Sequence, residues 1–431
     1  MSLDRLIQLR QAAREIFNAG LRAVDAREVT QTAVASLASK VDSTTPIYAL
    51  CIGKAALPMA VALEETLGSQ IKQGILTSTD QSLQLQPNKW QRFAGGHPLP
   101  TEESLAAAKA AFQILEKANA ERGVVIFAVS GGGSAMIEWP AYPDIELGDL
   151  QLANRLLVSC GATISEINSV RRRFSAVKGG KLAIRAANAQ LVTLIISDTN
   201  PGDEASVASG PSLLPNSDSP SASEIVKKYQ LDDQLPASIF RAIQQPSQPI
   251  TRSGTSPSHF VIADNKTAID AALTKAVALG FRTLVAEDIS EQPIAEGCDH
   301  LLRRISSEES PACLISGGEF SCPVRGDGRG GRNLETALRC AIQLDQSTIS
   351  QHTVVLSAGT DGVDGNSPAA GAFADETTLT RARALGLDAA DFLARSDSYS
   401  FFEKLGDAII TGPTGTNVRD LRIVLTLDPL Q

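Results

Sequence analysis

The sequence lacks a long apolar run and an excess of basic residues, and each absence excludes a class of protein. No stretch approaches the roughly 18 apolar residues of a membrane-spanning helix, and residues 1–10 contain no apolar signal core. Acidic residues outnumber basic ones by 48 to 39, whereas nucleic-acid binding favours a basic face. We therefore expect a cytoplasmic protein that binds neither membranes nor nucleic acids.

Cysteine and histidine patterns typical of metal sites are also missing. The six cysteines form no C-x-x-C pair and no zinc-ligand spacing, and His97 has no second histidine at such a spacing. Cys51 and Cys313 lie inside apolar runs, where cysteine behaves as a small hydrophobic residue. We predict reduced thiols, no zinc site, and a histidine at position 97 that orders its loop.

A chain of 431 residues exceeds what one hydrophobic core usually supports, so two domains are expected. Short apolar runs alternate with helical patterns in both halves, which favours α/β layers. We predict two layered α/β domains, 1–245 and 255–431, the first a Rossmann-like doubly wound parallel sheet. The linker candidate is Pro246-Ser247-Gln248-Pro249. The predicted strands are 47–52, 75–77, 124–129, 191–196, 260–262, 283–286, 313–315, 354–356 and 423–427.

Four glycine-rich loops each follow one of these apolar runs. They are Cys51–Lys54, Ser130–Ser134, Ser316–Glu319 and Ala358–Gly362. A glycine run after a strand lets backbone N–H groups approach an anion, because no Cβ blocks the way. Ligands of open α/β sheets bind beyond the carboxyl ends of the strands. The four loops together predict an inter-domain cleft that holds a polyanion.

In the first half, Lys54 begins a helix after a strand, where its ammonium could reach a phosphoryl oxygen; a solvated lysine is the alternative. The loop Ser130–Ser134 could form an anion nest or a tight turn, and no G-K-[ST] follows it. Asp198 ends a strand and could hold magnesium or accept a proton from a hydroxyl. The basic segment Arg171–Lys181 contains Gly179-Gly180, which predicts partial burial and an anionic partner rather than a solvated helix face.

In the second half, Arg332 lies where a glycine-rich loop enters a helix. Its planar guanidinium could bind phosphate oxygens through two hydrogen bonds at once. Asp361 and Asp364 lie three residues apart in a glycine-rich loop, a spacing that allows magnesium binding by one or both. The segment Thr411–Asn417 gathers hydroxyl and amide donors, which suits a sugar-like or nucleotide ligand; a rigid capped turn is the alternative.

These motifs, in this order, resemble the glycerate 2-kinases whose C-terminal part is called the MOFRL domain. The resemblance covers nearly the whole chain. The matching segments are Ile52–Ala56, Gly96–Pro98, Ser130–Ser134, Val177–Gly180, Ser209–Pro211, Asn265, Ser316–Glu319, Gly330–Asn333, Gly359–Gly365 and Thr411–Val418.

The resemblance implies transfer of the γ-phosphoryl group of ATP to D-glycerate, giving 2-phosphoglycerate and ADP, with Mg²⁺ as cofactor. Lys54 and Arg332 match the family's catalytically important lysine and arginine, and phosphoryl transfer depends mainly on charge neutralisation and positioning. The expected roles follow in one list: catalytic, Lys54, Arg332 and Asp198; nucleotide-binding, Ser130, Gly131, Gly132, Gly133, Ser134, Glu319, Thr414 and Asn417; substrate-binding, Arg171, Lys178 and Asn265; metal-binding, Asp361 and Asp364. We expect a monomer or homodimer.

Two other functions remain open from the sequence. Some relatives of the family carry the name hydroxypyruvate reductase, but a nicotinamide site is disfavoured because Met136 stands where a dinucleotide fingerprint has its third glycine. A non-catalytic metabolite sensor is the second alternative. Retention of Lys54, Glu319, Arg332, Asp361 and Asp364 together argues against it.

Overall fold

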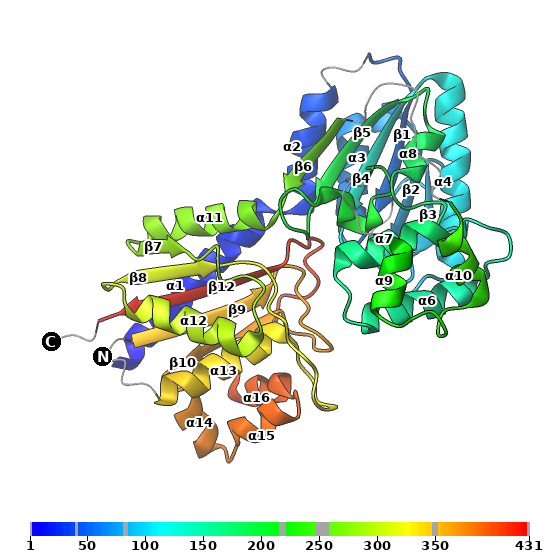
Figure 1. The fold of residues 1–431 in the computed structure, drawn as a ribbon. Helices are drawn as coiled ribbons and strands as arrows, with labels where there is room; N and C mark the ends of the chain where they lie inside the picture. Colours follow the sequence, from blue (N-terminus) through cyan, green and yellow to red (C-terminus); the bar gives the residue numbers. More distant parts are fainter. Residues whose placement is uncertain are drawn as a thin grey trace. The chain divides into compact units, whose positions relative to one another are not determined.

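The computed structural model describes residues 2–38, 42–80, 85–214, 221–246, 258–346 and 352–428. The chain forms two compact units, each with its own six-stranded sheet (Figure 1). The N-terminal unit comprises residues 26–262, and the C-terminal unit comprises residues 1–25 and 263–431. Within the described residues, no helix combines the length and apolar character that crossing a membrane requires.

The sheet of the N-terminal unit has the strand order β3-β2-β1-β4-β5-β6. Its strands are β1 (Ile47–Ile52), β2 (Ile71–Ser78), β3 (Trp90–Ala94), β4 (Val124–Ser130), β5 (Gln190–Ile196) and β6 (Ser258–Ala263). Strands β1 to β5 pair in parallel, as the sequence predicted. Every residue of β1 and β4 is buried, which is typical of a parallel sheet covered on both faces. The strand order reverses between β1 and β4, where ligands of such sheets bind.

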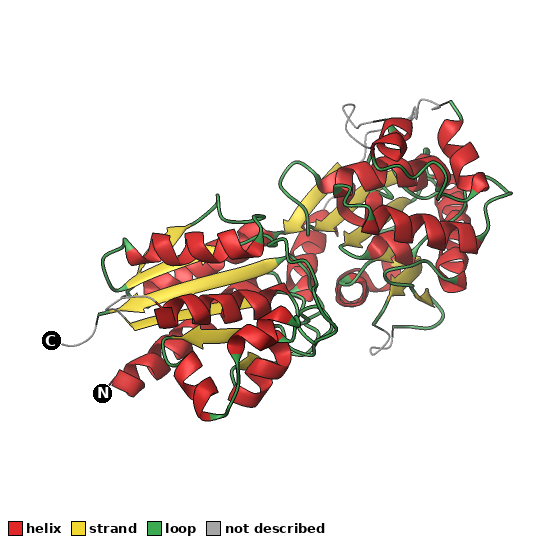
Figure 2. Cartoon of the chain, turned by 60° about the horizontal axis from the view of Figure 1, so that its bottom comes forward, coloured by secondary structure: helices red, strands yellow, loops and turns green. Residues whose placement is uncertain are grey.

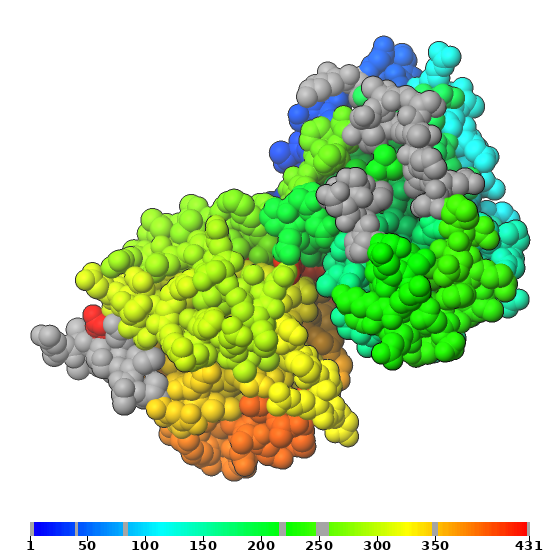
Figure 3. All heavy atoms as spheres, viewed as in Figure 1, coloured from blue at the N-terminus to red at the C-terminus, as the bar shows by residue number. Residues whose placement is uncertain are grey.

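Helices surround this sheet and form an additional helical lobe. The helices are α2 (Ala26–Ala38), α3 (Ala56–Leu67), η1 (Gly68–Gln70), α4 (Glu102–Glu121), α5 (Gly133–Met136), α6 (Leu147–Ser159), α7 (Ile164–Phe174), α8 (Lys181–Arg185), η2 (Glu204–Ser209), α9 (Ala222–Lys228) and α10 (Ala237–Gln244). Helices α6, α7, α9 and α10 share an apolar core of their own. The bright-green residues of α9 and α10 form much of the surface of this lobe (Figure 3).

The sheet of the C-terminal unit has the order β11-β10-β9-β12-β8-β7 and is mixed. Its strands are β7 (Arg282–Val285), β8 (Ala312–Ser316), β9 (His352–Gly359), β10 (Gly371–Asp375), β11 (Ala408–Ile409) and β12 (Asp420–Leu427). Only β7 and β8 pair in parallel among the pairings described, and the other neighbours run antiparallel. Strand β12 runs opposite to both β8 and β9, so its first residues share a sheet edge with their last residues.

Helices cover both faces of this second sheet (Figure 2). They are α1 (Ser2–Ala23), α11 (Asn265–Ala278), α12 (Ile294–Ser306), α13 (Arg332–Gln346), α14 (Thr378–Ala384), α15 (Ala389–Ala394) and α16 (Ser398–Leu405). Helix α1 packs against α11 and the strands β9 and β12. Its Arg10 also donates hydrogen bonds to Asp375 and Asp407, at 2.7 and 2.5 Å.

The units differ from the expected domains 1–245 and 255–431 at two places. Helix α1 packs in the C-terminal unit, because its apolar stripe is buried there, and β6 is the edge strand of the first sheet. An amphipathic pattern shows that a helix needs a partner but not which core supplies it. Of the predicted linker Pro246-Ser247-Gln248-Pro249, residues 247–249 lie outside the described residues.

Candidate functional site

The loops after β1 and β4 are tied together at the reversal of the N-terminal sheet. The backbone N–H of Lys54 donates to the carbonyl oxygen of Gly131 at 2.9 Å. The N–H of Ala55 donates to the hydroxyl of Ser130, also at 2.9 Å. Because β1 and β4 are neighbours in the sheet, the lysine and the predicted anion loop form one structural element.

Three polar side chains lie beside this loop, and one of them lies so close that glycine is required at position 131. A Cβ built on Gly131 would lie 1.9 Å from Oδ2 of Asp198, which follows β5. A Cβ built on Gly132 would lie 3.1 Å from Cγ of Lys54 and 3.4 Å from Cδ2 of His97. Gly132 also has a φ of 80°, a conformation that residues with a Cβ rarely adopt. The structure therefore brings the predicted residues Lys54 and Asp198 to the predicted loop, and it adds His97.

A buried ion pair in the interior of the unit holds the end of this loop. Lys178 donates to Oε2 of Glu138 at 2.5 Å and to the carbonyl oxygen of Ser134 at 2.7 Å. Both side chains of the pair are 1% exposed. Burial lowers the pKa of Lys178, and the charge of Glu138 opposes that shift. Ser134 further shares a 2.8 Å hydrogen bond with the hydroxyl of Ser209. Lys178, predicted as a substrate ligand, thus supports the loop from the interior.

The rest of the basic segment is also engaged inside the unit. Arg171 is buried, and its Nε donates to Oδ1 of Asn154 at 2.7 Å. Burial lowers the pKa of Arg171 to about 10. Lys181 donates to the carbonyl oxygen of Arg172 at 2.7 Å, and burial lowers its pKa to about 8. The predicted partial burial is confirmed, while direct contact of Arg171 with a substrate stays a prediction.

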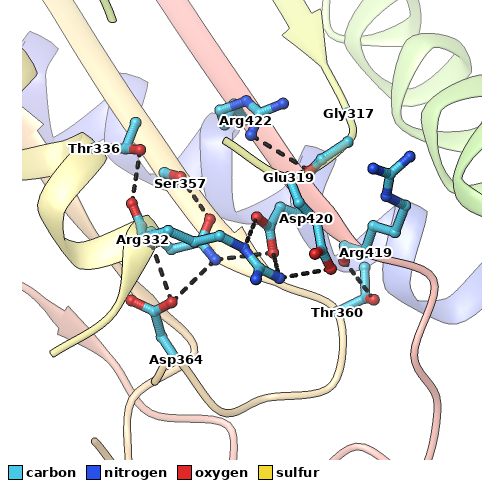
Figure 4. A network of polar contacts seen from close by, with 12 residues as sticks. Gly317, Glu319, Arg332, Thr336, Ser357, Thr360, Asp364, Arg419, Asp420 and Arg422 are labelled. Atoms are coloured by element: carbon cyan, nitrogen blue, oxygen red, sulfur yellow. Dashed lines mark hydrogen bonds and ion pairs between the residues drawn. The ribbon is translucent and has the colours of Figure 1, made fainter. Parts of the chain in front are cut away.

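A second polar cluster lies at the edge of the C-terminal sheet where β8 and β9 end and β12 begins (Figure 4). Arg332, the first residue of α13, binds Asp420 through two bonds: Nε to Oδ2 at 2.6 Å and Nη2 to Oδ1 at 3.1 Å. Its Nη2 also lies 2.7 Å from Oε1 of Glu319. Burial by itself lowers the pKa of Arg332, but the combined attraction of Asp420, Glu319 and Asp364 outweighs burial and raises the pKa. Arg332 is therefore a fixed, fully charged cation.

Asp364 caps the helix that Arg332 begins. Its Oδ1 accepts the N–H of Asn333 at 3.1 Å, and its Oδ2 accepts the N–H of Leu334 at 2.8 Å. These are N–H groups of the first turn, which no helix carbonyl can satisfy. Burial raises the pKa of Asp364 to about 7, against the lowering effect of the two backbone hydrogen bonds.

The predicted metal pair, Asp361 and Asp364, has polar partners inside its own unit. Both oxygens of Asp364 accept backbone N–H groups, and Asp361 accepts the N–H of Val363 at 3.2 Å. Among the residues that the structure describes, no group of three acidic, histidine or cysteine side chains could hold a metal ion. Magnesium is usually bound by one or two carboxylates together with substrate phosphates and water, so coordination by this pair stays a prediction.

Asn265 joins the Ser316–Glu319 loop to β12. Its Nδ2 donates to the carbonyl oxygens of Val418 and Asp420, at 2.7 and 3.0 Å. Its Oδ1 accepts the N–H of Gly318 at 3.0 Å. All three contacts are with residues of the same unit. Asn265, which the sequence predicted to bind substrate, therefore bridges the loop and the strand.

Thr414 and Asn417 stabilise the turn before β12. The hydroxyl of Thr414 donates to the carbonyl oxygen of Thr360 at 2.6 Å, and its N–H donates to the carbonyl oxygen of Asp361 at 3.2 Å. Asn417 accepts the N–H of Arg419 at 3.3 Å. These contacts favour the rigid capped turn, and nucleotide binding by this segment stays a prediction.

Sequence reasoning missed Asp420, Glu138 and Asn154. Asp420 stands at the boundary of a buried strand, the same signal that singled out Asp198, so it could have been found. Glu138 and Asn154 gave no such signal, because their partners lie 40 and 17 residues away in the sequence.

Comparisons with known proteins agree with this architecture. The family model "Domain of unknown function (DUF4147)" matches residues 12–244, and the MOFRL family matches residues 312–420. A D-glycerate 2-kinase of Thermotoga maritima is 34% identical over 88% of this chain and 90% of its own. A protein of Agrobacterium vitis named as a hydroxypyruvate reductase is 35% identical over 86% of this chain and 97% of its own.

A crystal structure of a glycerate kinase from Thermotoga maritima matches the fold with a TM-score of 0.84 and 32% sequence identity. The match covers 97% of this chain and 100% of the other. Likeness over the whole length, in sequence and in structure, shows that the chain belongs to the MOFRL-type glycerate kinase family, which is a family of phosphotransfer enzymes.

Proposed function

We propose that this protein transfers the γ-phosphoryl group of ATP to a hydroxyl of D-glycerate, giving 2-phosphoglycerate and ADP. The observation that carries the proposal is the grouping of Lys54 and Asp198 around the Gly131-Gly132 turn, at the carboxyl ends of three neighbouring parallel strands. A cation, backbone amides and a carboxylate are the groups that phosphoryl transfer to a hydroxyl needs. The relatives named as glycerate kinases support the choice of acceptor.

In this scheme the backbone N–H groups of the Ser130–Ser134 loop bind phosphate oxygens, and Lys54 neutralises charge on the transferring phosphoryl. Asp198 orients the acceptor hydroxyl and accepts its proton. We assign Arg332 the same kind of role because it matches the family's catalytically important arginine; its guanidinium is about a third exposed, and Asp420 fixes its orientation. The single cleft expected from the sequence stays a prediction.

Lys178 and Asn265 contribute to substrate binding by holding loops, because their side chains bond to residues of their own units. The Nε of Arg171 bonds to Asn154, and direct contact of this arginine with the substrate stays a prediction. Magnesium would enter as the complex with ATP, with phosphate oxygens and water as its main ligands, and coordination by Asp361 or Asp364 stays a prediction. No step of the scheme depends on a protein-bound metal.

The test is release of ADP from ATP and Mg²⁺ in the presence of D-glycerate, followed by identification of the phosphoglycerate isomer. The expected result is turnover that yields 2-phosphoglycerate and falls strongly in Lys54→Ala. Turnover only with another hydroxy acid would overturn the substrate, and absence of turnover with every hydroxy acid would overturn the kinase proposal.

Reduction of hydroxypyruvate is the second candidate, because the Agrobacterium vitis relative carries that name. The loop after β4 lacks the third glycine of a dinucleotide fingerprint and leads into α5, a helix of only four residues. Oxidation of NADH or NADPH by hydroxypyruvate without ATP would favour the reductase. We expect none.

A further inference from the structure

Arg422 is a fully buried cation that the proposed reaction does not use. It lies in the middle of the C-terminal sheet on β12 and is 1% exposed. Its guanidinium stacks on the ring of Phe320, 3.7 Å from the centroid. Burial lowers its pKa to about 10, so it stays charged at neutral pH. A buried cation is costly unless its hydrogen bonds are satisfied, so its contacts call for an explanation.

The contacts of Arg422 go to two loops at the edge of the sheet. Its Nε donates to the hydroxyl of Ser316 at 3.1 Å, and Nη1 donates to the carbonyl oxygen of Gly318 at 3.4 Å. Its Nη2 donates to the carbonyl oxygens of Ile289 and Ser290, at 3.5 and 3.4 Å. Within the described part of the chain, none of these direct partners is a carboxylate. The guanidinium therefore joins two loops through its hydrogen bonds, and Asp420 acts on it through charge alone.

The loop that Arg422 contacts is closely packed at its two glycines. A Cβ on Gly317 would lie 1.8 Å from Oδ1 of Asn265, and one on Gly318 would lie 2.6 Å from the carbonyl oxygen of Ser290. The next residue is Glu319, whose carboxylate meets Arg332 at 2.7 Å. A shift of Gly318 would therefore move the neighbouring residue, which is a partner of Arg332.

A second connection between Arg422 and Arg332 runs along strand β12. Asp420 and Arg422 are two residues apart on β12, so their side chains lie on one face of the sheet (Figure 4). Asp420 carries the two-bond contact to Arg332. Of the two carboxylates that orient Arg332, Glu319 thus follows the segment that Arg422 contacts, and Asp420 lies on the same strand as Arg422.

We propose that Arg422 is a positioning residue for phosphoryl transfer: it fixes the Ser316–Glu319 loop and thereby the orientation of the Arg332 guanidinium. This inference rests on the proposed function, in which Arg332 stabilises the transferring phosphoryl group. A lysine cannot replace the arginine here, because a single ammonium cannot span acceptors on two loops as a planar fork does.

The test compares Arg422→Lys, which keeps the charge, with Leu314→Ala on the adjacent strand β8. Leu314 is fully buried in the same apolar core as Phe320, and its truncation costs stability through a cavity while every hydrogen-bond acceptor of Arg422 stays in place. We expect R422K to lower kcat by on the order of tenfold or more with little change in KM, since displacement of a catalytic group by about 1 Å can cost up to about a hundredfold. L314A should keep kcat within about twofold of wild type.

Two further measurements separate positioning from simple destabilisation. In the Arg332→Ala background, R422K should produce no additional loss of kcat, because the residue it orients is gone. A full additional loss would overturn the proposal. Amide hydrogen exchange of the Ser316–Glu319 loop should become faster in R422K and not in L314A, and equal exchange in both would also overturn it.

The exchange measurement does not depend on activity, so it distinguishes the two proposals. If the wild-type protein transfers no phosphoryl group, the proposed function fails, and an unchanged loop in R422K then overturns the positioning role as well. Should R422K not fold, Ser316→Ala removes the acceptor of Nε together with the hydroxyl's own hydrogen bond to the carbonyl oxygen of Ile289, and it should lower kcat several-fold and loosen the same loop. Wild-type exchange in S316A would contradict the proposal.

Discussion

Removal of Arg332 should damage stability and activity by different mechanisms, which a second substitution can separate. Arg332→Ala leaves the carboxylate of Asp420, which is 1% exposed, without its cation. Breaking a buried ion pair costs about 3–5 kcal/mol. Because Arg332 itself is about a third exposed, solvent screens the pair, and we expect about 2–3 kcal/mol. Loss of a cation that stabilises the transferring phosphoryl should lower kcat by roughly 10² to 10³.

The double variant Arg332→Ala/Asp420→Asn should recover most of the lost stability. An amide at position 420 carries no charge that needs a partner, and its oxygen can still accept the 2.9 Å hydrogen bond from Nδ2 of Asn333. Activity should stay at the level of Arg332→Ala, because the amide does not replace the guanidinium at the phosphoryl group.

The assays are urea unfolding and ADP release, measured for the wild type, both single variants and the double variant. Equal instability of Arg332→Ala and the double variant would refute the view that the buried charge of Asp420 causes the loss. Recovery of turnover in the double variant would refute a catalytic role for Arg332 and reduce it to the neutraliser of Asp420.

Three other predictions follow from the described contacts. Lys54→Ala should lower kcat by roughly 10²-fold in the ADP-release assay, and near-normal turnover would remove it from the mechanism. Gly131→Ala should abolish most activity because its Cβ would lie 1.9 Å from Oδ2 of Asp198, whereas Gly148→Ala, with open space around it in α6, should keep activity and gain up to about 1 kcal/mol in urea unfolding. Asp364, with its pKa raised to about 7 in the folded state, keeps its proton longer than in the unfolded state, so the unfolding free energy of the wild type should fall between about pH 4 and pH 7 and level off above. Asp364→Asn should lack that part of the slope, worth up to about 4 kcal/mol, and parallel pH profiles of the two proteins would contradict the assignment.

The sequence could predict elements whose signal is local. Strands β1 and β4 are apolar runs that end in glycine, and such runs are buried wherever a parallel sheet forms. Strands β3, β10 and β11 were missed. Strand β3 has mostly polar or partly exposed residues, β10 consists largely of small residues, and β11 has only two residues. Each is paired only because a neighbouring strand presents its edge, which no local pattern reveals.

In the candidate site, too, local sequence signals predicted some features and the fold decided others. Glycine at 131 and 132, next to an apolar strand, indicated an anion loop without knowledge of the fold, because only glycine allows such an approach. The sequence could not show that Lys178 faces Glu138 inside the unit rather than a ligand, because a positive charge favours any nearby anion equally. The same uncertainty applied to Asp364, because a carboxylate is a suitable group both for binding a metal and for capping a helix.

The sequence by itself thus determined the two α/β units, the glycine loops and the kinds of charged group beside them, since backbone sterics and hydrophobic periodicity act over a few residues. Tertiary structure alone decided the roles of the charged residues and the packing of α1. It placed Asp420 against Arg332, 88 residues away in the chain, and Asp364 under the first turn of α13. The physical reason is that ion pairs and helix caps depend on distances of a few ångströms, and the folding of the whole chain sets those distances.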